Sequence, residues 1–248
     1  MDIKIENLSV SYGKKTVLEN INLTIPRKQI TAIIGRNGSG KSSLVSCFGG
    51  FMDYEGKIFI NGSDISLLSE KERAQHVSVM MQLLPSPHIT VSHLVSFGRT
   101  PYHSLLDKLN EDDLRIINES LESVGIYDLK DRYVDTLSGG ERRLAFYAMS
   151  LARTCPVMIF DEATAYMDAD NEGMLLDKLA GLKSDGKTVI TVMHNISDAV
   201  KYADNIILLD KKRCVFFGTV KEILETDILE KTMNVKRYHA DGRTFFSY

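Results

Sequence analysis

The sequence predicts an α/β fold with an inserted helical region, and three observations support this prediction. Short apolar runs rich in β-branched residues recur along the chain, as in buried strands. A glycine-rich segment at residues 35–42 separates one such run from a helical pattern. From Asn110 to about Ala152, apolar residues recur at helical spacing, for example at Leu114 and Ile117, and no strand pattern interrupts them. We therefore expect an α/β core into which a helical lobe is inserted.

Length and composition limit the class of protein. The 248 residues include 30 Lys and Arg against 33 Asp and Glu, so no basic excess indicates a nucleic-acid partner. The three cysteines are scattered and form no CxxC pair, which suits a reducing cytosol. The chain shows no signal-peptide pattern and no run of the roughly 20 apolar residues that a membrane helix needs. We therefore expect a soluble cytosolic protein.

The first part of the chain predicts paired strands before the glycine-rich segment. Residues 3–10 alternate between apolar and polar side chains, and residues 17–25 predict a second strand after a turn. Tyr12 lies at this turn, where its ring would either stack on an adenine or pack over the hairpin. Ser69 and Glu72 have the spacing of a capping box and predict a short helix. Further strands are predicted at residues 30–34, 57–62 and 77–81.

The rest of the chain predicts a long loop, a helical lobe and a return to the α/β pattern. Residues 83–104 contain three prolines and predict an irregular connection. We expect a single domain over residues 1–248, in which 1–82 and 153–248 form the core and about 83–152 the insertion. Beyond the insertion, strands are predicted at 157–161, 187–193, 205–209 and 214–217, and helices at 170–182 and 196–202. A helix pair is predicted over 220–234, and a terminal strand or hairpin at 235–248.

The glycine-rich segment fits the P-loop pattern of Gly, four residues and Gly-Lys-Ser. Glycines let backbone N–H groups surround a polyphosphate, and the following helix N-terminus adds unpaired donors and partial positive charge. Lys41 would reach the β- and γ-phosphates, and the Ser42 hydroxyl would bind Mg²⁺. The alternative is a glycine-rich surface turn, which the flanking strand and helix disfavour. The expected binding residues are Gly35, Arg36, Asn37, Gly38, Ser39, Gly40, Lys41, Ser42 and Ser43.

Three polar residues follow buried strands farther along the chain. Asp161 and Glu162 come at the end of one strand. The first would hold Mg²⁺ through water, and the second would orient or deprotonate an attacking water. His194 ends another strand and would contact a γ-phosphate. The alternative for the acids is a solvated acidic loop. For His194 the alternative is a histidine satisfied by local backbone, which the residue taken alone favours.

Residues 137–141, Leu-Ser-Gly-Gly-Glu, have two compatible interpretations. Ser138 and Glu141 form a capping box, which marks a helix start. Gly139 and Gly140 expose the backbone there, and a capped helix N-terminus also binds anions. Because the chain has a single P-loop, a second phosphate-binding helix end suggests the nucleotide of a second molecule.

Taken in order, these motifs resemble the ATP-binding subunits of ABC transporters over almost the full length of the chain. The resemblance implies a P-loop NTPase fold, with an ABC-type ATPase core, an antiparallel β subdomain and an inserted helical subdomain. It implies ATP and Mg²⁺ as cofactors. It also implies Lys41, Glu162 and His194 as catalytic residues, and Ser42 and Asp161 at the metal.

The same resemblance assigns the remaining candidate residues. Gln82 matches the Q-loop glutamine, a Mg²⁺ contact and a link to the membrane subunit. Tyr12 matches the adenine-stacking aromatic, and Asp168 matches the D-loop aspartate. The segment from Ser138 through Gly139 and Gly140 to Glu141 is similar to the family's LSGGQ motif, with Glu141 replacing glutamine.

The chain departs from the family pattern at two places. Ala163 replaces the proline that usually follows the acidic pair, and Tyr166-Met167 replaces Ala-Leu in the D-loop. Neither change removes a catalytic group. Within the family, residues 98–102 and the tail from Gly218 resemble importers of iron chelates, haem or vitamin B12.

The resemblance also implies partners and a location. An importer ATPase of this kind works as a homodimer that encloses ATP, on the cytoplasmic face of the membrane, with polytopic permease subunits and a substrate-binding protein. One alternative is a soluble ABC ATPase of DNA repair or translation, which the single P-loop and the lack of sustained heptads disfavour. Another is an ABC ATPase for a different transported substrate. A third is a regulatory module that binds ATP without hydrolysis, which Glu162 and His194 disfavour.

Overall fold

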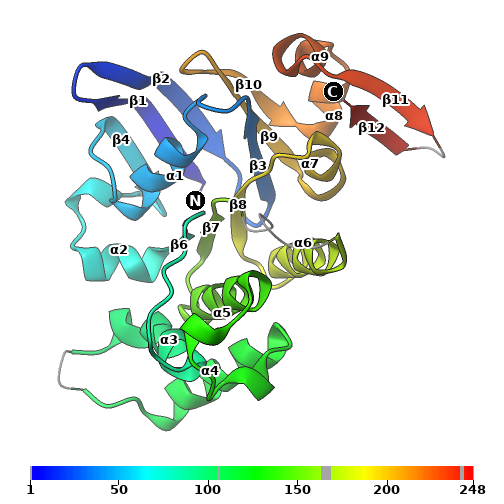
Figure 1. Cartoon of the computed structure of the whole chain (residues 1–248). Helices are drawn as coiled ribbons and strands as arrows, with labels where there is room; N and C mark the ends of the chain where they lie inside the picture. The colour runs from blue at the N-terminus through cyan, green and yellow to red at the C-terminus, as the bar shows by residue number, and fades with distance from the viewer. Residues whose placement is uncertain (1, 105–106, 163–168, 241–242, 248) are drawn as a thin grey trace.

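The computed structural model of the chain describes residues 2–104, 107–162, 169–240 and 243–247. Within these residues the strands form a six-stranded sheet, a four-stranded sheet and a two-stranded hairpin (Figure 1). In the view of Figure 1, the helices of the insertion lie at the bottom, the antiparallel sheet at the upper left and the hairpin at the upper right. The predicted fold class is therefore confirmed.

The central sheet is mostly parallel and carries the glycine-rich loop. Its strands are β3 (Ile30–Gly35), β6 (Val77–Met80), β7 (Val157–Phe160), β8 (Thr188–Val192), β9 (Asn205–Asp210) and β10 (Arg213–Thr219). They follow the order β10-β9-β3-β8-β7-β6, and only β10 is antiparallel to its described neighbour. Every residue of β3, β7 and β8 is buried, which explains their continuous apolar sequences. Residues that follow the parallel strands therefore meet at one edge of the sheet.

The second sheet is antiparallel and packs on the first through a helix. Its strands are β1 (Ile3–Tyr12), β2 (Lys15–Ile25), β4 (Glu55–Ile60) and β5 (Ser63–Asp64), in the order β2-β1-β4-β5. Helix α1 (Lys41–Gly49) follows the glycine-rich loop. Its Leu44 and Phe48 belong to the same buried cluster as Ile5 of β1 and Ile33 of β3. This cluster joins the antiparallel sheet to the loop-bearing sheet.

The insertion is more helical than predicted. Its elements are α3 (Val91–Ser96), η2 (Phe97–Tyr102), α4 (Glu111–Ser123), η3 (Tyr127–Leu129), η4 (Val134–Thr136) and α5 (Gly139–Ala152). The prediction of an irregular connection over residues 83–104 is wrong from residue 91 to residue 102. Thr90 begins α3, because its hydroxyl accepts a hydrogen bond from the N–H of His93 (3.3 Å).

The predicted apolar face of α4 is buried except at one residue. Ile117, Leu121 and Val124 are buried as the spacing predicts. Leu114, on the same predicted stripe, is 50% exposed. The first turn of α4 therefore has a buried side, which carries Asp113, and an exposed side, which carries Leu114.

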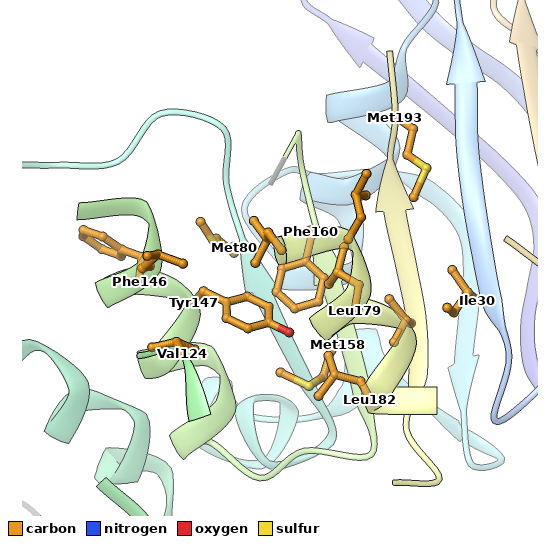
Figure 2. Close-up of a cluster of buried hydrophobic side chains, with 14 of the residues drawn as sticks. Ile30, Met80, Val124, Phe146, Tyr147, Met158, Phe160, Leu179, Leu182 and Met193 are labelled. Carbon is orange, nitrogen blue, oxygen red and sulfur yellow. The ribbon is translucent and has the colours of Figure 1, made fainter. Parts of the chain in front are cut away.

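One hydrophobic cluster joins the insertion to the central sheet (Figure 2). Tyr147 of α5 packs against Phe160, the last residue of β7, with ring centroids 5.2 Å apart. Met80, the last residue of β6, belongs to the same cluster. Helix α5 is thus packed against the two strand ends that precede Gln82 and Asp161. Because one core spans both parts, the division of the chain near residues 82 and 152 stays a prediction.

The remaining elements follow the predicted order. The capping box at Ser69 and Glu72 is present and begins α2. The remaining helices and strands are η1 (Ile65–Leu67), α2 (Glu70–His76), α6 (Ala169–Ser184), α7 (Ile196–Tyr202), α8 (Val220–Leu224), α9 (Ile228–Met233), β11 (Lys236–Ala240) and β12 (Arg243–Ser247). Among the helices of the described residues, none has both the length and the apolar character to cross a bilayer.

Candidate nucleotide-binding and catalytic site

The glycine-rich loop connects β3 to α1, as predicted. Gly35, Gly38 and Gly40 have φ angles of 153°, 77° and 102°, values that favour glycine. A Cβ atom on Gly35 would lie 2.3 Å from the carbonyl oxygen of Leu209, and one on Gly40 would lie 2.5 Å from Cδ2 of Leu18. The loop therefore requires glycine, and it ends at a helix N-terminus, where the first N–H groups have no intrahelical partner and suit a phosphate.

Lys41 is the first residue of α1 and is only 6% exposed. Its Nζ donates hydrogen bonds to the carbonyl oxygens of Gly35 (2.9 Å) and Arg36 (3.2 Å). Burial lowers the pKa of Lys41, while the carboxylates of Glu162 and Asp161 act in the opposite direction. The ammonium group is thus held between the loop and two acids.

A cavity of about 490 Å³ lies against the loop. It brings together the ends of β3, β6, β7 and β8, because these parallel strands finish at the same edge of the sheet. The predicted site residues Gln82, Glu162 and His194 meet Lys41 there, although they are far apart in sequence. The lining residues are Val17, Asn37, Gly38, Gly40, Lys41, Ser42, Ser43, Gln82, Glu162 and His194.

Glu162 is held by two of the predicted site residues. The side-chain amide of Gln82 donates a hydrogen bond to its Oε2, and Nε2 of His194 contacts its Oε1. The Glu162 side chain is 10% exposed and that of His194 is 51% exposed. Glu162 also has a φ of 54°, in the left-handed region that a side chain disfavours. The carboxylate is therefore fixed in orientation at the cavity wall, unlike that of a solvated acidic loop.

Asp161 is fully buried beside this network. Its backbone N–H donates to the carbonyl oxygen of Met80 (2.8 Å). Neither carboxylate oxygen has a hydrogen-bond partner of good geometry among the described residues. Burial raises the pKa of Asp161, and the nearby Ser42 hydroxyl and Lys41 ammonium oppose this shift. Such an orphaned carboxylate is costly in a protein interior, and a cation would relieve the cost.

Residues 138–141 begin α5 as a capping box. The N–H of Ser138 donates to Oε2 of Glu141 (2.8 Å), and the N–H of Glu141 donates to the Ser138 hydroxyl (3.2 Å). These contacts lower the pKa of Glu141. A Cβ atom on Gly139 or Gly140 would meet no described atom within 4 Å, so this helix end is open. The helix-start interpretation is confirmed, and anion binding at this end stays a prediction.

Several predicted site residues do not line the cavity. Tyr12 is 57% exposed at the β1–β2 turn, and the segment from Ser138 to Glu141 also lies outside the lining residues. Gly35 and Arg36 contribute only carbonyl contacts to Lys41, and the Ser39 hydroxyl is buried without a hydrogen-bond partner among the described residues. Asp168 and the departures at Ala163, Tyr166 and Met167 lie outside the described residues.

The sequence analysis did not predict two residues of the site, Val17, which lines the cavity, and Arg143. Arg143 of α5 is 5% exposed. Its Nη1 donates to the backbone carbonyl of Glu162 (2.9 Å), and its Nη2 donates to that of Gln82 (3.3 Å). The sequence feature that could have identified Arg143 is its place on the side of the predicted helix that carries buried apolar residues.

The comparisons with known proteins agree with this geometry. The model of the ABC transporter family matches residues 18–165. The iron(3+)-hydroxamate import ATP-binding protein FhuC of Bacillus subtilis is 33% identical, covering 94% of this chain and 88% of its own length. The petrobactin import ATP-binding protein YclP of the same species is 36% identical, and the alignment covers 92% of this chain and 91% of YclP. The ferric enterobactin transport ATP-binding protein FepC of Escherichia coli is 35% identical, covering 93% and 86%.

Solved structures share the fold. An inward-facing structure assigned to the metal-chelate type of ABC transporter aligns with a TM-score of 0.83 and 25% identity, covering 99% of this chain and 95% of the other. The ATP-binding cassette MJ1267 in its ADP conformation aligns with a TM-score of 0.81 and 22% identity, covering 94% and 98%.

Proposed function

Because this chain belongs to the ABC transporter family, we propose that it is the ATP-hydrolysing subunit of an importer for iron chelates such as siderophores. The relatives named for import of ferric hydroxamate, enterobactin and petrobactin support the substrate class, since each aligns over most of both chains. One observation carries the catalytic part of the proposal. Gln82 and His194 hold the carboxylate of Glu162 at the wall of the cavity that Lys41 lines.

The chain's own residues account for phosphate binding and proton removal. The loop backbone and Lys41 bind the β- and γ-phosphates of ATP. A water between the γ-phosphate and Glu162 attacks the γ-phosphorus and gives its proton to that carboxylate, which acts as general base, while the bond from the γ-phosphorus to the bridging oxygen breaks and ADP leaves. Gln82 and His194 orient the base, since each contacts one of its oxygens. General-base help of this kind is worth about 10²–10⁴-fold in rate.

The residues present also fit a Mg²⁺ ion. The cation is usually held by one or two carboxylates together with substrate phosphates. The Asp161 oxygens, which have no hydrogen-bond partner of good geometry among the described residues, suit that role. The Ser42 hydroxyl would be a second ligand, and Gln82 would be a third through its side-chain oxygen, since only its amide nitrogen is bonded to Glu162. When bound, the cation neutralises charge on the phosphates.

A second copy of the chain completes the site. Ser138 to Glu141 begin a helix whose glycines face open space, and these residues lie outside the cavity of their own subunit. A two-fold partner brings them to the γ-phosphate, so that ATP lies between the subunits. Tyr12 is exposed and free to stack on the adenine. Asp168 belongs to the same junction in the family pattern.

A permease docks on the segment that follows Gln82. A hollow of about 840 Å³ lies between α2 and η2, with apolar Phe97, Pro101 and Leu109 beside charged Glu70 and Lys71. Phe97 is 40% exposed, and an apolar centre with a charged rim suits a protein partner. This interface places the subunit on the cytoplasmic face of the membrane, and a substrate-binding protein delivers the chelate on the other side.

The proposed function is tested by uptake in the native host. A deletion strain is grown in low iron and supplied in turn with a ferric hydroxamate, a ferric catecholate, haem or cobalamin. We expect loss of ATP-dependent uptake of one ferric siderophore, restored by the wild-type chain and not by Glu162→Gln. Unchanged uptake of both ferric siderophores in the deletion strain would overturn the substrate class.

A further inference from the structure

Arg143 connects helix α5 to the two strand ends that carry the proposed base. Its guanidinium is buried and donates to the backbone carbonyls of Glu162 (2.9 Å) and Gln82 (3.3 Å). These are the two residues whose side chains meet in the Gln82–Glu162 hydrogen bond. One planar side chain therefore fixes both peptide groups that present this pair to the cavity.

The backbone of Glu162 needs such a contact. Its φ of 54° places a residue with a full side chain in the left-handed region, which persists only where surrounding contacts over-determine it. On its N-terminal side, the Asp161 N–H is bonded to Met80 of β6. On its C-terminal side, the carbonyl of Glu162 accepts from Arg143. If the second contact is lost, the peptide can turn and carry the carboxylate away from Gln82 and His194.

The helix that supplies Arg143 also begins with the open motif of residues 138–141. Arg143 lies two residues after Glu141 on α5, and its neighbour Arg142 donates to the Ser86 hydroxyl (2.9 Å) on the segment after Gln82. Tyr147 packs on Phe160 one helical turn farther on. Helix α5 therefore contacts the strand ends in two ways, through the Tyr147 ring that packs on Phe160 and through the hydrogen bonds of the Arg143 guanidinium.

We propose that Arg143 is a positioning residue that makes the geometry of Glu162 follow the position of helix α5. The inference rests on the proposed function, in which Glu162 is the base and the start of α5 meets the ATP of the partner subunit. Through Arg143, contact of α5 with the partner's nucleotide aligns the base in the subunit's own site. The two ATP sites of the dimer are thereby linked by one side chain.

The test is a double-mutant cycle on the full-length chain, measured alone and with its permease. Arg143→Gln should lower kcat for ATP by about tenfold or more, with the Kd for MgATP changed less than about twofold, because misplacing a catalytic group lowers rate more than binding. In the Glu162→Gln background, Arg143→Gln should alter the remaining single-turnover rate by less than about twofold. The reason is that Arg143 acts through the Glu162 carboxylate, so the effects of the two substitutions are not additive. Arg115→Gln on α4 removes a guanidinium paired only with exposed Asp112 and Glu119 among the described residues, and should keep wild-type kcat.

The outcomes separate the inference from the function on which it rests. Equal losses from Arg143→Gln in both backgrounds, or an unchanged kcat in the wild-type background, overturn the positioning role. If Glu162→Gln itself keeps wild-type turnover, the proposed function fails, whatever Arg143→Gln does. Circular dichroism verifies folding. Should Arg143→Gln not fold, Arg143→Lys replaces it under the same criteria, because it keeps the charge but loses the planar fork.

Discussion

The side-chain amide of Gln82 donates a hydrogen bond to the carboxylate of Glu162, although the two residues belong to segments 80 positions apart. The contact exists because β6 and β7 are parallel neighbours in the sheet, so that their carboxyl ends coincide. His194 follows β8, the neighbour of β7 on the other side, and reaches the second carboxylate oxygen. Three adjacent parallel strands thus bring three side chains together, and two of them, Gln82 and His194, contact the carboxylate of the third, Glu162.

The glycines of the phosphate loop should be sensitive to the addition of one methyl group. Gly35→Ala places a Cβ atom 2.3 Å from the carbonyl oxygen of Leu209, and backbone on a central strand cannot move away easily. We expect the free energy of unfolding to fall by about 1–3 kcal/mol, the scale for overpacking, and MgATP binding to weaken. Urea unfolding and calorimetric titration measure the two effects.

A matched control exists on α6. Gly181 has no described atom within 4 Å of an added Cβ, and it lies within a helix, where alanine is favoured. Gly181→Ala should therefore raise stability by about 0.5–1 kcal/mol and leave nucleotide binding unchanged. Equal stability losses in the two variants would contradict the steric argument.

The strand ends of the site were predictable from sequence, and the contact between lobes was not. Buried parallel strands have unbroken apolar sequences, so the polar residues that follow them stand out. This pattern marks Glu162 and His194 as strand-end candidates beside the loop that carries Lys41, and the family resemblance adds Gln82 to the same site. Arg143 has no such local signal, because its carbonyl partners lie 19 and 61 residues away in the chain.

The error at residues 91–102 has a different origin. Helix α3 has six residues, too few for helical spacing to emerge from the sequence. Pro85, Pro87 and Pro101 flank it, and prolines indicate loops. Burial of Val91 and Val95 against the insertion stabilises the helix, which is a tertiary effect.

The insertion contains a buried charge cluster that should lose its contribution to stability in acid. Asp113 accepts a hydrogen bond from Nε of Arg99 (2.9 Å) and contacts Nε2 of His103 (2.7 Å). Burial alone would raise the pKa of Asp113. The bonds from the Asn110 N–H, Arg99 and His103 outweigh it, so the pKa falls from its ordinary value of 3.8 to about 2. A carboxyl with a lowered folded pKa stabilises the fold above its unfolded pKa, and this contribution is lost as pH falls from about 4 through about 2.

Asp113→Asn should therefore destabilise the chain in a pH-dependent manner. At pH 7 we expect the free energy of unfolding to fall by about 3 kcal/mol, the scale for breaking a buried ion pair. Urea unfolding repeated at pH 3 should show a smaller difference from wild type, because the wild-type carboxyl is then partly protonated in the unfolded chain. Asp112→Asn, at an 81% exposed neighbour, should have almost no effect. A difference for Asp113→Asn that is equal at both pH values would argue against the ion-pair explanation.

The hollow beside η2 should be needed for assembly and not for nucleotide binding. Phe97 lines it and is 40% exposed, so Phe97→Asp adds a charge with little disturbance of the core. We expect the Kd for MgATP to be unchanged and co-purification with the permease to fall about tenfold or more, the scale for burying an unpaired charge in an interface. Val215→Asp alters a similarly exposed side chain on β10 and should assemble normally. Normal assembly of both variants would move the docking surface elsewhere.

The last prediction joins the chemistry to the assembly of two copies. Glu162→Gln removes the proton acceptor and keeps the size of the side chain, while Lys41 and the loop backbone stay intact. We expect turnover to fall by about 10² or more, as for loss of a general base, while MgATP still binds. ATP that is bound and not hydrolysed should then hold two subunits together, so that the variant accumulates as a dimer that wild type forms only transiently.

Light scattering with MgATP measures that dimer, and a second change locates its interface. Ser138→Arg in the Glu162→Gln background places bulk and charge at the open start of α5 and should return the protein to a monomer. The Ser138 side chain is exposed, so the larger group has room, and loss of its cap on α5 should cost only about 1 kcal/mol. Arg115→Gln in the same background leaves this surface unaltered, and the dimer should persist. A folded Glu162→Gln variant that stays monomeric at saturating ATP, both alone and after release from the permease complex, would exclude a nucleotide shared between two copies. The reason is that the 138–141 segment does not line the cavity of its own subunit, so its contact with ATP requires a second copy.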